Sequence, residues 1–213
     1  MTHPFSDYQV IITRLDHPSE QSPLIALFAQ IVEEQSWQPH NQLYAYPLSS
    51  VYFEVKVEGV LAGGLQLVRS GSSEGLPCLT VWPELALQDR SDVADVALFA
   101  VAKPYRGKSH LFWRTLVEAW RYSDAHMITE LWMELAPPDL RVYRRLGVPL
   151  EIRGPLRPHW GEECYPCCMG IAAIEEVFIA KAKQVPLYRA IVAHAYRDRP
   201  GALEQALSLD LTQ

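Results

Sequence analysis

Apolar and polar positions alternate along the chain with two different periods, and these periods predict a mixture of helices and strands. Apolar residues at helical spacing predict an amphipathic helix over residues 23–37, with Pro23 in its first turn. The runs 51–57 and 60–68 alternate as strands do, and Glu58-Gly59 between them offers a tight turn. The two runs are therefore expected to form an antiparallel hairpin, with a candidate bulge at Gly63-Gly64.

The second half of the chain shows the order strand, helix, strand, helix. Residues 93–101 are predicted to form a strand that runs straight into a short polar loop, and a helix is expected over 109–122. A strand over 128–135 and a short helix over 140–146 follow, with Gly147 at the end of that helix. The pattern also predicts shorter strands at 8–14, 149–153 and 164–171.

The last forty residues have a purely helical pattern. It is interrupted at Pro186 and at Pro200-Gly201, and it carries an apolar stripe that includes Leu187 and Ile191. We expect a main domain over residues 1–173 and a helical extension over 174–213. The extension would pack on the domain or build the interface of a homodimer.

Size and charge narrow the class of protein. A chain of 213 residues with 49% hydrophobic residues suits one domain with appended segments. The net charge of -6 and the absence of a Lys/Arg run argue against nucleic acid or an anionic membrane as the main partner. No apolar stretch reaches the roughly 18 residues of a membrane span, and the polar start has no signal-peptide pattern, so a cytoplasmic location is expected.

The four cysteines are too few for a disulfide framework in a chain of this length, and we expect reduced thiols. Cys164, Cys167 and Cys168 form a cluster with His159 upstream, which resembles the spacing of metal ligands. A single C-x-x-C without a second pair is a weak metal signal, so we interpret these cysteines as strand residues. No metal is expected.

The loop from Lys103 to His110 carries the clearest chemistry. A strand that enters an Arg-Gly-Lys loop and then a helix can bind phosphate, because amides at the start of a helix and its dipole supply positive potential. Arg106 and Lys108 would add charge, and Gly107 would let the backbone approach the anion. The phosphate of coenzyme A or of a carrier-protein arm would fit. The alternative is an ordinary polar turn capped by Ser109.

The residues of this loop resemble a known family signature. Val101-Ala102-Lys103-Pro104-Tyr105-Arg106-Gly107-Lys108 resembles V-x-P-x-Y-R-G-K-G-I-G of the GNAT acyltransferases, with Ser109 and Leu111 in place of small residues. A second element, Val142 to Val148, is similar to the F-Y-x-x-x-G-F element of that family.

The resemblance implies an α/β (α+β) GNAT fold, in which a mixed, mostly antiparallel central sheet is flanked by helices, here with extra C-terminal helices. It also implies a thioester of coenzyme A or phosphopantetheine as donor. In this interpretation Ser109 and His110 lie at the phosphate, although His110 could equally face water. Tyr143 would protonate the departing thiolate. The alternative for Tyr143 is a tyrosine packed on the sheet.

One branch of that family, the acyl-homoserine-lactone synthases and the N-acyl amino acid synthases, resembles more of the chain, from about residue 23 to 171. The paired aspartates of the lactone synthases fall where this chain has Tyr44 to Pro47, and their hairpin arginine corresponds to Gln66. Their W-E-L-S-R-F strand corresponds to residues 94–99, with Asp95 for Glu and Leu98 for Arg. The acceptor side is therefore altered, and we infer a different acceptor or none.

Acyl transfer to an amine needs a base, and Asp95 is the first candidate. A carboxylate among apolar strand residues would have its pKa raised by desolvation, with Glu54 and Glu134 as rivals. The alternative places Asp95 at a solvent-facing strand start. Backbone groups of Phe99, Ala100 and Val101 are expected to pair with the amides of pantetheine like an added strand.

Several aromatic residues could line a pocket for an acyl chain or an aromatic acceptor. The candidates are Trp37, Phe53 and Trp82, with Tyr44 and Tyr46 beside them, and Gln66 is assigned to the same pocket. As core aromatics they would need no such role.

The sequence thus predicts an enzyme, an N-acyltransferase that moves an acyl group from an acyl carrier protein or coenzyme A to a small amine. An acyl carrier protein would then be a protein partner. The alternative is a non-catalytic GNAT-like module that keeps the ligand groove and acts as a sensor or regulator.

Overall fold

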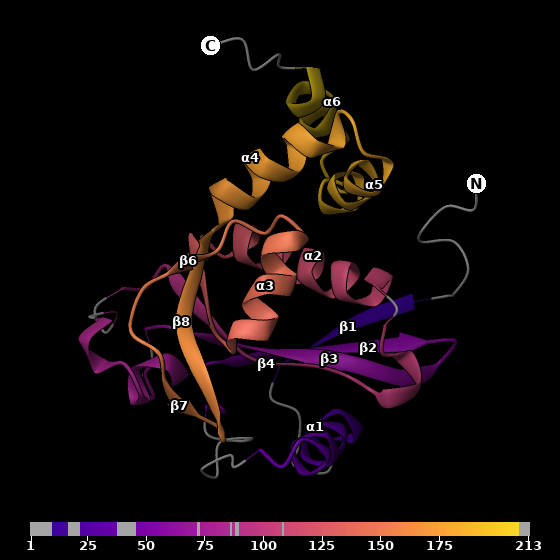
Figure 1. Ribbon diagram of the computed structural model, residues 1–213. Coiled ribbons are helices and arrows are strands. Elements are labelled where there is room, and N and C mark those ends of the chain that lie inside the picture. The colour runs from indigo at the N-terminus through magenta and orange to yellow at the C-terminus, as the bar shows by residue number, and fades with distance from the viewer. Residues whose placement is uncertain are drawn as a thin grey trace.

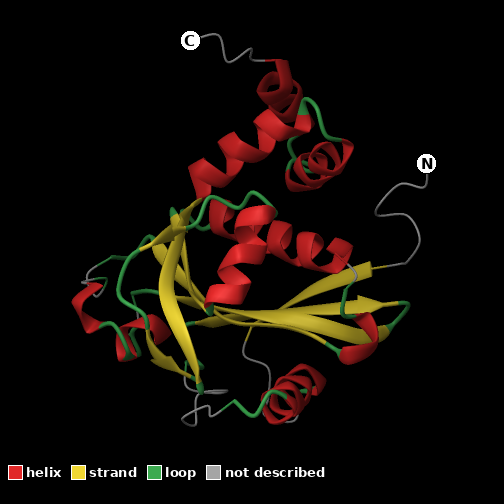
Figure 2. Cartoon of the chain, viewed as in Figure 1, coloured by secondary structure: helices red, strands yellow, loops and turns green. Residues whose placement is uncertain are grey.

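The computed structural model describes residues 10–16, 22–37, 46–71, 73–85, 87, 90–107 and 109–208. They form one open, mixed sheet with helices on both faces (Figures 1 and 2). The described strands are β1 Val10–Asp16, β2 Ser50–Val57, β3 Val60–Arg69, β4 Val93–Val101, β5 Glu130–Leu135, β6 Glu151–Ile152, β7 Arg157–His159 and β8 Glu162–Gly170. The described helices are α1 Pro23–Glu34, α2 Ser109–Ala125, α3 Pro137–Arg145, α4 Ile171–Ala182, α5 Pro186–Ala195 and α6 Pro200–Ser208.

The strands lie in the order β1-β2-β3-β4-β5-β8-β6, with β7 paired to β8 outside that path. Strands β1 to β4 form an antiparallel meander, and β5 then joins β4 in parallel before β8 returns antiparallel to β5. The predicted mixed, mostly antiparallel sheet is confirmed. In Figure 1 the sheet twists so strongly that β8 crosses the direction of β2 to β4.

Two apolar layers cover the sheet. Helices α2 and α3 lie over one face and α1 over the other (Figure 1). The core on the α2 side includes Trp113, Trp120 and Leu131, and the core on the α1 side includes Ile25 and Phe28. Helix α1 buries its predicted apolar stripe, and no described helix is long and apolar enough to cross a membrane.

The C-terminal helices share the core of the sheet. Ile174 and Phe178 of α4 and Ile191 of α5 belong to the same buried cluster as Trp113 of α2. Helix α4 begins at Ile171, directly after β8, so the expected boundary after residue 173 falls inside a helix. Pro186 and Pro200 each begin a helix, because a proline at the first position loses no helical hydrogen bond.

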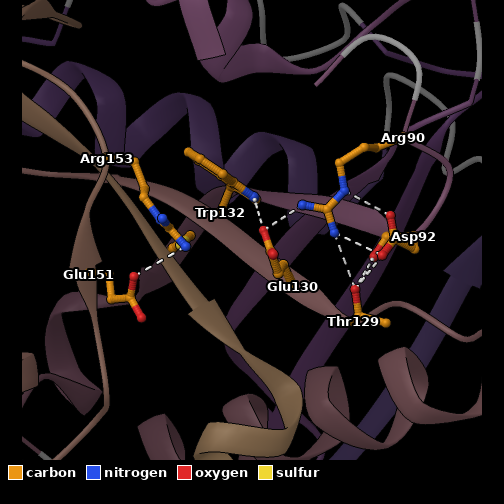
Figure 3. A network of polar contacts seen from close by, with 8 residues as sticks. Arg90, Asp92, Thr129, Glu130, Trp132, Glu151 and Arg153 are labelled. Atoms are coloured by element: carbon orange, nitrogen blue, oxygen red, sulfur yellow. Dashed lines mark hydrogen bonds and ion pairs between the residues drawn. The ribbon is translucent and has the colours of Figure 1, made fainter. Parts of the chain in front are cut away.

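Strands β4 and β5 are held together at one end and separate at the other. Arg90, just before β4, forms ion pairs with Asp92 at 2.8 Å and with Glu130 of β5 at 2.9 Å (Figure 3). Trp132 Nε1 donates to Glu130 at 3.1 Å, and a further ion pair, Glu151–Arg153, lies nearby on the β6 side. The parallel pairing runs only from Val93↔Glu130 to Asp95↔Trp132.

A bulge in β4 changes which side chains face each layer. The register with β3 shifts between Gln66↔Leu98 and Leu67↔Val96, which leaves Ala97 as the extra residue. Val96 and Phe99 therefore pack on the α2 side although they are three positions apart, while Leu98 faces α1. Past Asp95, no described strand pairs with the β5-facing edge of β4.

Gly63 of β3 lies against the part of β4 that follows the bulge. A Cβ at Gly63 would lie 2.5 Å from the Ala100 carbonyl oxygen, which is fixed in the sheet. We expect Gly63→Ala to lower the free energy of unfolding by about 1–3 kcal/mol in denaturant titration. Gly201→Ala on α6, where a Cβ meets nothing within 4 Å, is the matched control and should be neutral or slightly stabilising. Equal stability of both variants and the parent chain would contradict this reading of the β3–β4 contact.

Candidate functional site

A groove of about 800 Å³ opens where β4 and β5 separate. Its described walls come from the end of α1, strands β4 and β5, the loop before α2, helix α3, and the turn from β7 into β8. These segments are distant in sequence, and they meet around the gap where β4 and β5 stop pairing. The groove is largely apolar with polar groups at its two ends, which is the usual composition of a small-molecule site.

Two carboxyl groups lie deep at the point where the strands part. Asp95 on β4 is 0% exposed, and Glu134 on β5 lines the groove with its side chain 5% exposed. The Cys78 backbone N–H donates to Asp95 Oδ2 at 2.8 Å. Asp95 Oδ1 and Glu134 Oε1 are buried with no other donor among the described residues, and the two side chains hydrogen-bond to each other. The expected interior position of Asp95 is confirmed, and the solvent-facing alternative is wrong.

Burial and mutual repulsion shift the protonation of this Asp95–Glu134 pair. Burial raises the pKa of Asp95 to about 6. Burial also raises the pKa of Glu134 well above its usual range, and the nearby charge of Asp95 raises it further. Near neutral pH the two groups therefore hold one proton and one negative charge between them, an arrangement that can accept one more proton.

His159 and Cys78 complete the surroundings of the pair. His159 Nε2 lies 4.0 Å from Glu134 Oε2, and the His159 ring rests on Trp82 with ring centroids 5.9 Å apart. The Cys78 sulfur and one oxygen each of Asp95 and Glu134 lie within 4.8 Å of one another, the one set of potential metal ligands found among the described residues. Burial raises the pKa of the Cys78 thiol, so its protonated form is favoured.

Aromatic and acidic side chains form the end of the groove next to His159. Trp37 and Trp160 pack edge to face with ring centroids 6.1 Å apart. Trp37 Nε1 donates to Glu162 Oε1 at 2.9 Å, which ties the exit of α1 to the start of β8. Asp139 at the start of α3 also lines this end. Tyr44 lies outside the described residues, and among the described candidates for a substrate pocket Trp37 is the one that lines the groove.

The loop before α2 forms the opposite end. Arg106 and Gly107 line the groove, and Gly107 has a φ of +82°, which glycine adopts without strain. The Arg106 guanidinium forms an ion pair with Glu34 of α1 at 2.7 Å and donates from Nε to the Val101 carbonyl at 3.1 Å. Lys108 lies outside the described residues, as do the side chains of Ser109 and His110 at the start of α2.

Between the two ends, β4 presents Phe99, Ala100 and Val101 along the groove. Tyr143 of α3 faces them and packs against Phe112, with ring centroids 5.3 Å apart. Burial raises the pKa of the Tyr143 phenol, so this group stays protonated across the neutral range. A protonated phenol beside the groove can serve as a proton donor.

Three residues assigned to the substrate pocket lie elsewhere. Phe53 faces the α2 side and packs on Tyr122, with ring centroids 5.8 Å apart. Gln66 is buried and donates to Ser50 Oγ at 2.9 Å and to the Tyr52 hydroxyl at 3.1 Å. Trp82 lies behind His159 and donates from Nε1 to the Pro155 carbonyl at 2.8 Å. None of the three is among the described residues of the groove wall.

Glu54, the other rival base, forms an ion pair with Lys56 at 2.6 Å and does not line the groove. The sequence pattern marks Glu134 only as a rival base and does not mark Trp160, Glu162 or Asp139 as groove residues. The available signal is Gly161, because a glycine directly before β8 indicates a turn there.

A mixed sheet that separates between two parallel strands, with a basic loop leading into a helix at the gap, defines the GNAT fold. No protein-family model matches the sequence, and no curated protein matches it. Among solved structures, FeeM, an N-acyl amino acid synthase from uncultured soil microbes, aligns with a TM-score of 0.68 at 17% identity, over 80% of this chain and 96% of FeeM.

Two further structures share the architecture. The CoA-dependent acyl-homoserine lactone synthase BjaI aligns with a TM-score of 0.60 at 13% identity, over 79% of this chain and 87% of BjaI. An acetyltransferase of the GNAT family from Streptococcus pneumoniae aligns with a TM-score of 0.54 at 14% identity, over 76% of this chain and 99% of that protein. The chain therefore has the GNAT fold, and its sheet follows that of acyltransferases over most of their length.

Proposed function

We propose that this protein is an N-acyltransferase, which moves an acyl group from a phosphopantetheine thioester to a small amine. The observation that carries the proposal is the position of the Asp95–Glu134 pair. A buried carboxyl pair with one negative charge lies where the unpaired edge of β4 opens into the groove. The acyltransferase architecture of the similar structures supports the same reaction class.

The donor arm would lie along β4. Its amides would pair with backbone groups of Phe99 and Val101 at this open edge, as an added strand does. The Ala100 carbonyl points at β3, and the Val101 carbonyl would exchange its hydrogen bond from Arg106 Nε for one from the arm. Its phosphates would reach the loop of Arg106 and Gly107 and the first amides of α2. The similarity to a CoA-dependent synthase supports coenzyme A as one source of the arm, and an acyl carrier protein presents the same arm.

The reaction balances with the groups in the groove. An acceptor ammonium gives one proton to the Asp95–Glu134 pair, and the free amine nitrogen then attacks the thioester carbonyl carbon to form a C–N bond. The tetrahedral intermediate expels the sulfur as the C–S bond breaks, and Tyr143 protonates the departing thiolate. The second N–H proton then passes to the Tyr143 phenolate, and the pair releases the first proton to solvent. The net products are an amide, a thiol and one proton.

A direct experiment follows free thiol. Acyl-CoA and acyl-carrier-protein donors of several chain lengths are incubated with a pool of amines, and thiol release is measured with and without the pool. The proposal predicts amine-dependent release with at least one donor. Tight donor binding with no release for any donor and amine would contradict it, and would favour a regulatory GNAT-like module.

Arg106 provides a prediction specific to the donor. If its guanidinium binds phosphate, Arg106→Gln should raise the donor Kd about tenfold in calorimetric titration with a coenzyme A thioester. Glu34→Gln is the matched control, because it removes the same ion pair but leaves the cation. We expect Glu34→Gln to bind the donor as tightly as the parent chain or more tightly. An equal loss in both variants would show that the ion pair itself, not the phosphate contact, matters.

A further inference from the structure

We propose that the acceptor is an organic cation, a primary amine that carries no carboxylate group. This inference rests on the proposed N-acyltransferase function and specifies its substrate class. This acceptor differs from that of the structurally similar N-acyl amino acid synthase FeeM, because an amino acid carries a carboxylate as well as an amine.

Three carboxyl groups converge on one end of the groove. Glu134, Asp139 and Glu162 line it from β5, α3 and β8. Their fields overlap at Cys164, where burial and then the charges of these groups raise the pKa of the thiol to about 12. Glu162 also raises the pKa of Asp139, after the effect of burial. Acidic side chains therefore predominate at this end of the groove.

The buried carboxyl pair points to a ligand here, beyond the acidic cluster itself. Glu134 lines the groove, and its Oε1 and Asp95 Oδ1 are buried with no donor among the described residues other than the proton that the two groups share. A buried pair that keeps a negative charge is costly, and an ammonium would donate a hydrogen bond to it and offset that charge. An amine bound there would also lie next to the group that removes its proton.

The aromatic walls suit the organic part of such a cation. Trp37 and Trp160 line the acidic end, and the Trp37 indole is fixed by its hydrogen bond to Glu162. Tryptophan faces attract organic cations, most strongly where water is excluded. An alkyl or aromatic amine would thus find apolar contact and negative charge together.

The described groove residues include no Lys or Arg at this end. Among the described groove residues Arg106 is the one Lys or Arg, and it belongs to the donor end. Outside the described ranges the sequence has one Lys or Arg, Lys108, which directly follows Gly107, and three histidines, His3, His17 and His40. His159 lies beside Glu134. The carboxylate of an amino acid would therefore face like charges, which disfavours its binding.

Matched acceptors test this inference. Tyrosine, tyrosinamide and tyramine share a side chain and differ in the carboxylate, and leucine, leucinamide and isoamylamine form an aliphatic set. With one working thioester donor, kcat/KM should be at least about tenfold higher for the amides and amines than for the free amino acids. Equal or better use of free amino acids would overturn the inference while leaving the N-acyltransferase function intact. No turnover with any acceptor and donor would overturn both.

A charge-neutral variant adds a second readout. Glu162→Gln removes one negative charge and keeps an oxygen that can accept from Trp37 Nε1, so the preference for tyrosinamide over tyrosine should fall several-fold. Glu176→Gln, on the exposed side of α4, removes the same charge far from the groove wall and should leave the preference unchanged. An unchanged preference in Glu162→Gln would contradict the acidic end as the selective element.

Discussion

Replacing Glu134 with Gln is expected to lower kcat/KM for acyl transfer by roughly 10²–10⁴-fold, the usual contribution of a general base. Glu134 lines the groove and shares a proton with Asp95, so the substitution removes the oxygen that meets the acceptor. Asp95→Asn should lower activity as well, because it removes the negative charge that the pair holds. Steady-state kinetics at saturating donor would measure both.

Controls separate a catalytic effect from a structural one. Glu54→Gln changes another buried carboxylate that lies off the groove, and it should keep activity. Asn at position 95 can still accept the hydrogen bond from the Cys78 N–H. Full activity of Glu134→Gln would remove Glu134 from the mechanism, and loss of activity together with loss of folding would assign it a structural role.

The same pair makes both activity and stability depend on pH. Because burial raises the pKa of Asp95 to about 6, kcat/KM should fall as the pH drops through about 6 and the pair loses its charge. The effect on stability has the opposite direction. The pKa of Asp95 is about 6 in the folded chain and about 4 in the unfolded chain, so the folded state binds the proton more tightly. Asp95 therefore contributes its full stabilisation below pH 4, and this contribution is lost as the pH rises through 6. Denaturant titrations at pH 5 and pH 8 should show this decline in the parent chain and less of it in Asp95→Asn.

Phe178→Ala should be the most damaging substitution outside the groove. Phe178 of α4 is fully buried, and its ring packs on Trp113 at 5.5 Å and on Trp120 at 6.1 Å between centroids. Removing the ring should cost about 3–5 kcal/mol of unfolding free energy. In a chain of this size such a loss lowers Tm by about 6–20 °C, measurable by thermal scanning.

Val185→Ala provides the control, because Val185 precedes α5 and is 41% exposed. Its cost should stay within about 0.5 kcal/mol. The contacts of Phe178 also imply that a chain ending at Ala173 would expose Trp113 and would not fold by itself. A shortened chain with an unchanged unfolding transition would show that the C-terminal helices are an independent unit.

Local signals explain which elements could be predicted. The β2–β3 hairpin turns at Glu58-Gly59, and α2 begins after the Arg106-Gly107 turn. Both turns could be predicted, because a glycine marks each of them in the sequence. Strand β7 was missed. Its turn into β8 places Trp160 at a φ of +54°, a conformation that bulky residues rarely adopt, so Gly161 alone marked this turn in the sequence.

The arrangement of the site depends on contacts between residues that are distant in sequence, and a local sequence pattern does not predict such contacts. The burial of Asp95 followed from its apolar neighbours on one strand and was predicted. The pairing of Asp95 with Glu134 required the register between β4 and β5, and the ion pair of Arg106 joins residues 72 positions apart. Phe53 and Trp82 lie off the groove wall, because residue type alone does not say which face of a sheet a side chain occupies.

The most direct test of the account follows the acyl group itself. The protein is incubated with a thioester labelled with ¹³C at its carbonyl carbon and with tyramine, and the products are identified by mass spectrometry. The account predicts a labelled amide, formed in equal amount to the released thiol and nearly absent with Glu134→Gln. Unchanged thioester with every donor, or labelled free acid as the sole acyl product, would contradict it.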